Sequence, residues 1–166
     1  KRGLITELYP ENMSFGEDLV FVLNYLKHCN RISFTQEPLY QHEVYNSVSL
    51  THSFSPARFS NLEDIQKAIL DFADDKNKIN PRIYDKYVKD ALHLTRMWYK
   101  NKNVPYIRKK EIIGEWLKQS YIRKLKISDY QLHWKDRMLL HCLHMSCFIG
   151  INLIVNGKEY INSLSK

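Results

Sequence analysis

Two acidic residues stand at the start of a strongly apolar segment, and this combination constrains the fold more than any other feature of the sequence. Residues 14–21 read SFGEDLVF, and almost every position from Asp18 to Leu26 is apolar. A helix that is apolar nearly all round must be covered on most of its sides. We therefore expect a buried helix over residues 15–29, with the carboxylate of Asp18 projecting from its first turn on an apolar face.

The acidic pair has two interpretations. In the first, Ser14 and Glu17 form a capping box, in which the serine hydroxyl accepts from the backbone N–H of Glu17 and the glutamate side chain returns to Ser14. Acidic side chains in a first turn also suit the helix dipole. In the second, Asp18 is a general base that takes a proton from an incoming hydroxyl group. Spacing alone favours capping, which explains Glu17 better than Asp18.

Several short motifs follow the acidic pair. Leu-Lys-His-Cys lies at 26–29, Pro-Leu-Tyr-Gln-His at 38–42 and Ser-Val-Ser at 47–49. With these motifs, residues 2–50 resemble the end of the catalytic domain of family 2 glycosyltransferases, enzymes with a nucleotide-sugar fold of the GT-A type. Beyond Leu50 the chain is similar to that family only in its helical character.

The resemblance implies a role for particular residues. Asp18 would be the general base of an inverting transfer from a nucleotide-sugar donor to the hydroxyl of a glycan or lipid-linked acceptor. Glu17 would position the mouth of the helix or contact the acceptor. His42 would lie near the metal and the diphosphate, with a satisfied strand histidine as the alternative, and Ser47 and Ser49 would help to close the sugar-diphosphate pocket. Such enzymes act in the synthesis of cell-surface polysaccharides and glycoconjugates.

The same resemblance implies parts that this sequence lacks. Members of the family bind Mg²⁺ or Mn²⁺ through an Asp-x-Asp motif in a nucleotide-binding half. Neither the motif nor that half has a counterpart in this sequence. Asp74 and Asp75 do not replace the motif, because they are adjacent and stand in the wrong place. We therefore predict no metal ligands in this chain. We also expect a fragment of a longer bacterial enzyme that is inactive alone, because it cannot neutralise the leaving diphosphate.

The predicted fold class is mainly α. Residues 1–50 are expected to be the C-terminal remnant of a GT-A α/β domain, with one buried helix and two short strands. The strands are placed at 31–35 and 40–44, where polar and apolar side chains alternate. Residues 51–60 are predicted to be a linker, and residues 61–166 a helical C-terminal appendage.

The appendage is predicted to be a helical bundle. Ser60 and Glu63 fit a capping box for its first helix. Pro81 and Pro105 are expected in the first turns of the second and third helices, the third being interrupted near Ser120. The positions of the second helix that are predicted to face inward are Tyr84, Tyr87, Val88, Ala91, Leu94 and Trp98.

A fourth, long helix is predicted from a cap formed by Ser128 and Gln131 to about Val155, with Asn156-Gly157 as its stop. Between Arg137 and Lys158 the chain has no Asp, Glu, Lys or Arg, a length sufficient to span a bilayer. Polar residues interrupt the stretch, and they are costly at the bilayer centre. A buried bundle helix is therefore preferred to an interfacial helix, and both are preferred to a membrane span.

The net charge of +7 is concentrated in one segment. Residues 105–126 carry seven basic and two acidic side chains, and so a local net charge of +5. As an alternative function, residues 60–156 would be a non-enzymatic module that binds a partner or an anionic membrane surface. The candidate side chains are Lys109, Lys110, Arg123 and Lys124. A solvated bundle face is the simpler interpretation, and nucleic acid is not expected because no zinc-finger spacing, RNP-like motif or Gly-rich loop is present.

Three cysteines without a Cys-x-x-Cys spacing suit a reducing compartment. His141, Cys142, His144 and Cys147 include metal-capable groups, but neighbouring residues point about 100° apart on a helix. Because no second cluster completes four ligands, core packing is the preferred interpretation. Nothing at the start of the sequence resembles a signal peptide. The predicted location is the cytoplasm, with a peripheral position at the inner face of the membrane as an extension of this prediction.

Overall fold

The computed structural model describes residues 10–11, 13, 15–37, 55–73 and 82–164, with the backbone alone for 158–164. All the secondary structure of these residues is helical, which confirms the predicted mainly α class. The α-helices are α1 (Glu17–Leu26), α2 (Ala57–Phe72), α3 (Ile83–Lys100), α4 (Tyr106–Gln119), α5 (Trp134–His144) and α6 (Phe148–Leu164). Two short 3₁₀ helices, η3 (Tyr121–Lys124) and η4 (Ile127–Asp129), connect α4 to α5.

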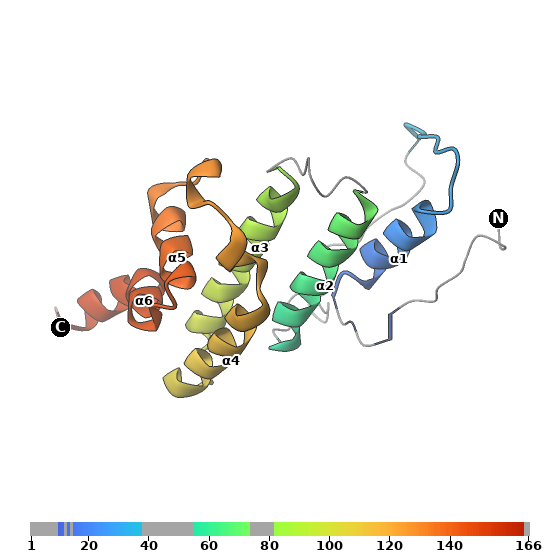
Figure 1. Ribbon diagram of the computed structural model, residues 1–166. Coiled ribbons are helices and arrows are strands. Elements are labelled where there is room, and N and C mark those ends of the chain that lie inside the picture. The colour runs from blue at the N-terminus through green and yellow to red at the C-terminus, as the bar shows by residue number, and fades with distance from the viewer. Residues whose placement is uncertain (1–9, 12, 14, 38–54, 74–81, 165–166) are drawn as a thin grey trace.

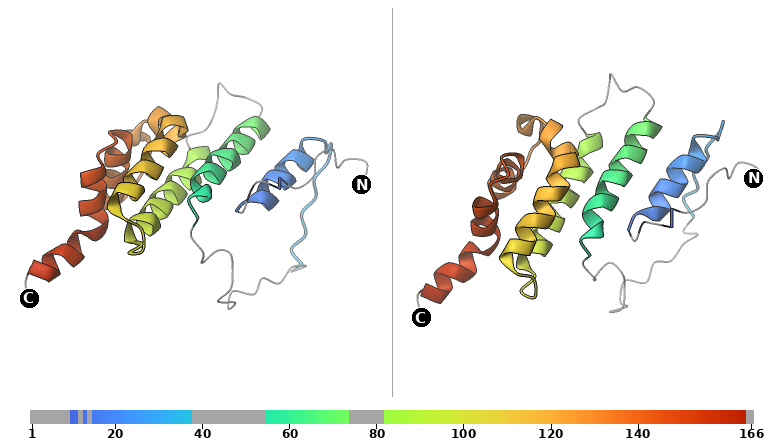
Figure 2. Two further views of the ribbon diagram at one scale, coloured as in Figure 1. Left: turned by 90° about the horizontal axis from the view of Figure 1, so that it is seen from below. Right: turned by 60° about the horizontal axis from the view of Figure 1, so that its bottom comes forward.

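The helices are arranged in a row, with α1 and α6 at opposite ends (Figure 1). α2 packs against α1 on one side and against α3 on the other, and α3 also contacts α4, α5 and α6. Both views in Figure 2 keep this order. α3 is therefore the central element of the bundle, and α2 joins α1 to it.

α3 and α4 follow the predicted helical pattern. The predicted inward positions Tyr87, Val88, Ala91, Leu94 and Trp98 are all buried, and Tyr84 packs at the edge of the core. α4 begins directly after its N-cap Pro105, and the extended backbone of Ser120 ends it. Apolar residues repeating every three or four positions place one stripe of each helix in the core.

Two predictions for the first part of the chain are wrong. Residues 31–35 are irregular and exposed and form no strand, and the second predicted strand, 40–44, lies outside the described residues. α1 contains no fully buried residue, and Val22 is 45% exposed. In the described part of the chain α1 packs mainly on one neighbour, α2, so only one of its apolar sides is covered.

The predicted capping box of Ser60 and Glu63 is also wrong. α2 begins at Ala57, so Ser60 lies within the helix, where its Oγ donates to the carbonyl oxygen of Ala57 at 2.8 Å. Serine inside a helix commonly bonds back to the preceding turn. The side chain of Glu63 is instead directed into the bundle.

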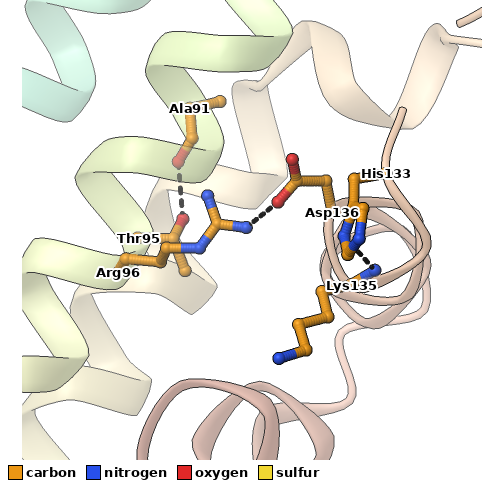
Figure 3. Close-up of polar contacts among 6 residues, drawn as sticks. All are labelled: Ala91, Thr95, Arg96, His133, Lys135 and Asp136. Atoms are coloured by element: carbon orange, nitrogen blue, oxygen red, sulfur yellow. Dashed lines mark hydrogen bonds and ion pairs between the residues drawn. The ribbon is translucent and has the colours of Figure 1, made fainter. Parts of the chain in front are cut away.

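The predicted long helix over 128–155 is divided into α5 and α6. α5 begins at Trp134, after the N-cap His133, whose Nδ1 accepts from the backbone N–H of Lys135 at 3.4 Å (Figure 3). Figure 3 also shows the ion pair that joins Arg96 of α3 to Asp136 in the first turn of α5. Ser128 lies in η4 and caps no α-helix.

α5 ends in a Schellman motif. The N–H of Cys147 donates to the carbonyl of Cys142 at 2.7 Å, and the N–H of Ser146 donates to the carbonyl of Leu143 at 3.0 Å. Ser146 has φ 54°, the left-handed conformation that usually selects glycine at this position. α6 then continues through Asn156-Gly157 to Leu164, so the predicted helix stop at Asn156-Gly157 is wrong.

Candidate functional site

α1 meets α2 at Gly16, directly before the acidic pair. Gly16 has φ 77°, and a Cβ atom there would lie 2.2 Å from Cδ1 of Ile65 on α2. The positive φ therefore favours glycine, and a side chain at this position would also have to displace the side chain of Ile65. The guanidinium of Arg58 on α2 lies 5.1 Å from the ring centre of Phe15, a cation–π contact. These two contacts fix the start of α1 against α2.

Glu17 and Asp18 form the first turn of α1. Asp18 is exposed, and its Oδ1 accepts from the backbone N–H of Leu19 at 2.7 Å. Glu17 is half-buried, and the ion pairs found among the described residues involve neither carboxylate. The arrangement presents the Asp18 carboxylate to solvent at the positive end of the helix dipole, where it can accept a proton from a hydroxyl group.

The structure does not support the capping interpretation of Glu17. The N-cap of α1 is Gly16, which has no side chain, and among the described residues no side-chain hydrogen bond caps the start of the helix. Glu17 therefore occupies the first helical position, whereas a capping box places its glutamate at the third. Ser14, the predicted partner, lies outside the described residues.

The predicted substrate-binding residues His42, Ser47 and Ser49 also lie outside the described residues, so their roles remain predictions from the resemblance. The part of the chain that the structure describes contains no group of three His, Cys, Asp or Glu side chains able to hold a metal ion. A divalent cation of the kind that the resemblance implies therefore has no ligand set in this part.

The four basic residues predicted to form an anionic-binding surface have different environments. Lys109 is buried, and its Nζ donates to the carbonyl oxygen of Tyr99 at 2.7 Å, while desolvation lowers the pKa of Lys109. Lys110 and Lys124 lie over the rings of Phe148 and Tyr121, respectively. Arg123 donates from Nη2 to the Ser146 hydroxyl at 2.8 Å. Lys109 thus stabilises the bundle, and we leave it out of any proposed surface.

Glu63 is a buried carboxylate whose environment the sequence did not predict. Its Oε1 accepts from the Tyr87 hydroxyl at 2.5 Å and from the Trp116 indole N–H at 2.6 Å, and its Oε2 accepts from the backbone N–H of Tyr121 at 3.1 Å. The Tyr87 and Ser120 hydroxyls are 2.7 Å apart. The cluster joins α2, α3, α4 and η3, so we assign it a structural role.

Burial dominates the electrostatics of this cluster. Desolvation raises the pKa of Glu63 above its ordinary value of 4.5, and the hydrogen bonds from Tyr87, Trp116, Tyr121 and Ser120 oppose this shift. The pKa of Tyr87 is also raised, first by desolvation and then by the charge of Glu63. Both shifts follow from placing ionisable groups in a poorly solvated interior.

In the described part of the chain, no helix combines the length and the apolar character needed to cross a membrane. No protein-family model matches the sequence, and no curated protein or solved structure matches it significantly.

Proposed function

We propose that this chain forms the C-terminal part of an inverting glycosyltransferase in which Asp18 is the general base. The proposal rests on the resemblance of residues 2–50 to family 2 glycosyltransferases. The observation that carries it furthest is the position of the acidic pair. Asp18 is exposed in the first turn of α1, and Glu17 is half-buried beside it, next to a glycine that fixes the helix start against α2.

In the proposed reaction, the Asp18 carboxylate takes the proton of an acceptor hydroxyl while that oxygen attacks the anomeric carbon of a nucleotide-activated sugar. The new glycosidic bond forms as the bond to the nucleoside diphosphate breaks, so a single displacement inverts the anomeric configuration. Glu17 orients the acceptor or the first turn of the helix. The groups that bind the nucleotide and stabilise the leaving diphosphate would come from polypeptide outside this sequence.

Exposed apolar side chains near α1 support its place in a larger domain. Phe34 is 94% exposed, and Ile32 and Val22 are about half exposed. Ile32 and Phe34 are two positions apart in the segment that follows α1, and exposed apolar side chains that lie together often mark an interaction surface. A packed nucleotide-binding half would cover this region and would complete the burial expected for α1.

The test is the substitution Asp18→Asn in the complete enzyme, with Asp64→Asn as the matched control, since Asp64 is an exposed acidic residue of α2. Release of nucleoside diphosphate and the mass of the glycosylated acceptor measure transfer, and circular dichroism checks the fold. We expect Asp18→Asn to lower kcat by about 10²–10⁴-fold, the usual range for a general base. The control should keep the parent rate. Near-parental transfer by Asp18→Asn would overturn the assignment.

The alternative function, binding of an anionic surface, is compatible with this proposal because it uses another part of the molecule. Burial of Lys109 removes one of its four predicted side chains, Lys109, Lys110, Arg123 and Lys124, and favours α5 as an alternative location for this binding.

A further inference from the structure

Large apolar side chains are exposed on α5 and the start of α6. We call this surface the α5 face; its apolar members are Trp134, Met138, Met145, Ile149 and Leu153, each at least about half exposed. Trp134, Met138 and Met145 are separated by four and seven positions, so they lie along one side of α5 and its end. Ile149 and Leu153 are four positions apart on an exposed side of α6, and α6 packs against α5. Isolated apolar residues are common on surfaces, but a group of this size calls for a partner.

A basic cavity opens beside the α5 face. It has a volume of 790 Å³ and lies between the η3–η4 segment and α5. Its lining residues are Leu125, Lys126, Ile127, Ser128, Arg137, His141, His144 and Met145. Two of these carry a permanent positive charge, two are histidines, and none is acidic.

The charges of this cavity are not compensated within the described part of the chain. The ion pairs found there involve neither Lys126 nor Arg137. Asp136, the nearest acidic residue in sequence to Arg137, is paired with Arg96 of α3 (Figure 3). Lys126 and Arg137 are therefore available to a negatively charged ligand.

Met145 belongs to both features, because it lines the cavity and is 78% exposed on the α5 face. A ligand that satisfies both must carry a negative group beside an apolar body. An anionic phospholipid has this composition, with a phosphate in the headgroup and acyl chains directly below. Tryptophan is also favoured at the boundary between water and lipid, where Trp134 would lie.

We propose that the α5 face docks on an anionic membrane surface and that the cavity between η4 and α5 receives the phosphate of a phospholipid headgroup. Trp134, Met138, Met145 and Ile149 insert at the level of the headgroups, in the manner of interfacial amphipathic helices. Lys126 and Arg137 bind the phosphate oxygens, arginine through its planar pair of donors. This inference does not depend on the proposed transferase activity, because the two share no residue.

Flotation of the purified protein with lipid vesicles tests the inference. Vesicles of phosphatidylcholine alone are compared with vesicles that also contain phosphatidylglycerol. We expect binding to the second kind, weakened by salt, with the emission of Trp134 shifted to the blue and a Trp134→Phe variant identifying that signal. Each basic side chain near an anionic surface contributes about 1 kcal/mol, or about fivefold in affinity. Lys126→Gln with Arg137→Gln should therefore reduce binding by about 25-fold.

The matched control is Lys67→Gln with Lys89→Gln, which removes the same charge from exposed positions of α2 and α3. The control should bind nearly as the parent does. Equal losses in the two pairs would overturn the inference, because net charge alone would then explain binding. Met145→Ser with Ile149→Ser should also weaken binding, and unchanged binding by this pair would overturn the insertion of the α5 face.

Competition with inorganic phosphate separates the possible sources of the phosphate group. Binding of free phosphate without any vesicle binding would overturn membrane docking and leave a soluble ligand. Capture of another protein through the α5 face, again without vesicle binding, would also overturn it.

Discussion

Replacement of Glu63 should destabilise the bundle by an amount that the geometry allows us to work out. Glu63→Ala leaves the Trp116 indole N–H and the Tyr121 backbone N–H without their acceptor, while the Tyr87 hydroxyl keeps its contact with Ser120. Each unsatisfied buried donor costs about 1–3 kcal/mol, so the two donors give an expected loss of about 2–6 kcal/mol in the free energy of unfolding.

Glu63→Gln is the milder change. If the glutamine oxygen takes the position of Oε1, the hydrogen bonds from Tyr87 and Trp116 are kept. The glutamine NH₂ group then faces the backbone N–H of Tyr121, so two donors oppose each other at this position. We expect a loss of about 1.5–3 kcal/mol, the range for a hydrogen bond to a charged group.

The difference in the free energy of unfolding between the parent protein and Glu63→Gln should depend on pH, because the pKa of Glu63 is raised. A raised pKa means that the folded protein binds the proton more tightly than the unfolded chain does. The contribution to stability is complete below the ordinary pKa of 4.5 and is lost as the pH rises through the raised value. The advantage of the parent over Glu63→Gln should therefore be larger at acidic pH than at neutral pH, while both proteins remain folded.

Urea unfolding followed by circular dichroism measures these differences at each pH. Glu115→Gln is the control, because Glu115 is an exposed glutamate of α4; its effect should stay within about 0.5 kcal/mol. The slope of free energy against urea should not change if only stability is affected. A Glu63→Gln protein as stable as the parent at every pH would refute the structural role of this cluster.

Two further substitutions test backbone conformation. Gly16→Ala should lower the free energy of unfolding by about 1–2 kcal/mol because of its positive φ, plus a contribution from the overlap with Ile65. In the double variant with Ile65→Val, urea unfolding should show recovery only of the stability lost through the overlap with Ile65. Full recovery would contradict the claim that the positive φ of residue 16 is strained for alanine. Ser146→Gly should be more stable than Ser146→Ala by about 1 kcal/mol, since both lose the contact with Arg123 but only glycine suits φ 54°. Equal thermal stability of these two variants would show that the left-handed conformation is not strained.

The sequence predicts the parts of the fold that depend on local patterns. α3 and α4 have a clear apolar repeat and a proline near the start, so the inward residues of α3 and the start of α4 at Pro105 could be named in advance. The boundary between α5 and α6 could not be predicted, because the Schellman motif has serine at the position where glycine is the usual signal. The start of α5 was missed for a related reason, since histidine rather than serine acts as its N-cap.

The buried carboxylate could not be predicted, because its partners are distant in sequence. Tyr87, Trp116 and Tyr121 are 24, 53 and 58 residues from Glu63, and no local spacing reports such contacts. The glutamate instead matched a capping box, a pattern that specifies only two residues, here Ser60 and Glu63, and so often occurs by chance. For the acidic pair the sequence gives the right position at the start of a helix, whereas the burial of that helix depends on neighbours that periodicity does not identify.

α2 links the candidate general base, Asp18, to the rest of the bundle. One side of α2 contacts α1, and the opposite side contacts α3, α4 and η3. Residues two positions apart on a helix point about 200° apart, so Glu63 and Ile65 face in nearly opposite directions. Glu63 bonds to α3, α4 and η3, while Ile65 meets Gly16 at the start of α1. Loss of the Glu63 contacts would therefore loosen the support on which Asp18 is placed. The two effects are separable, because Asp18→Asn should lower transfer strongly at a loss of only about 0.3–1 kcal/mol in stability, whereas a Glu63 variant can lower transfer only as far as it weakens the fold.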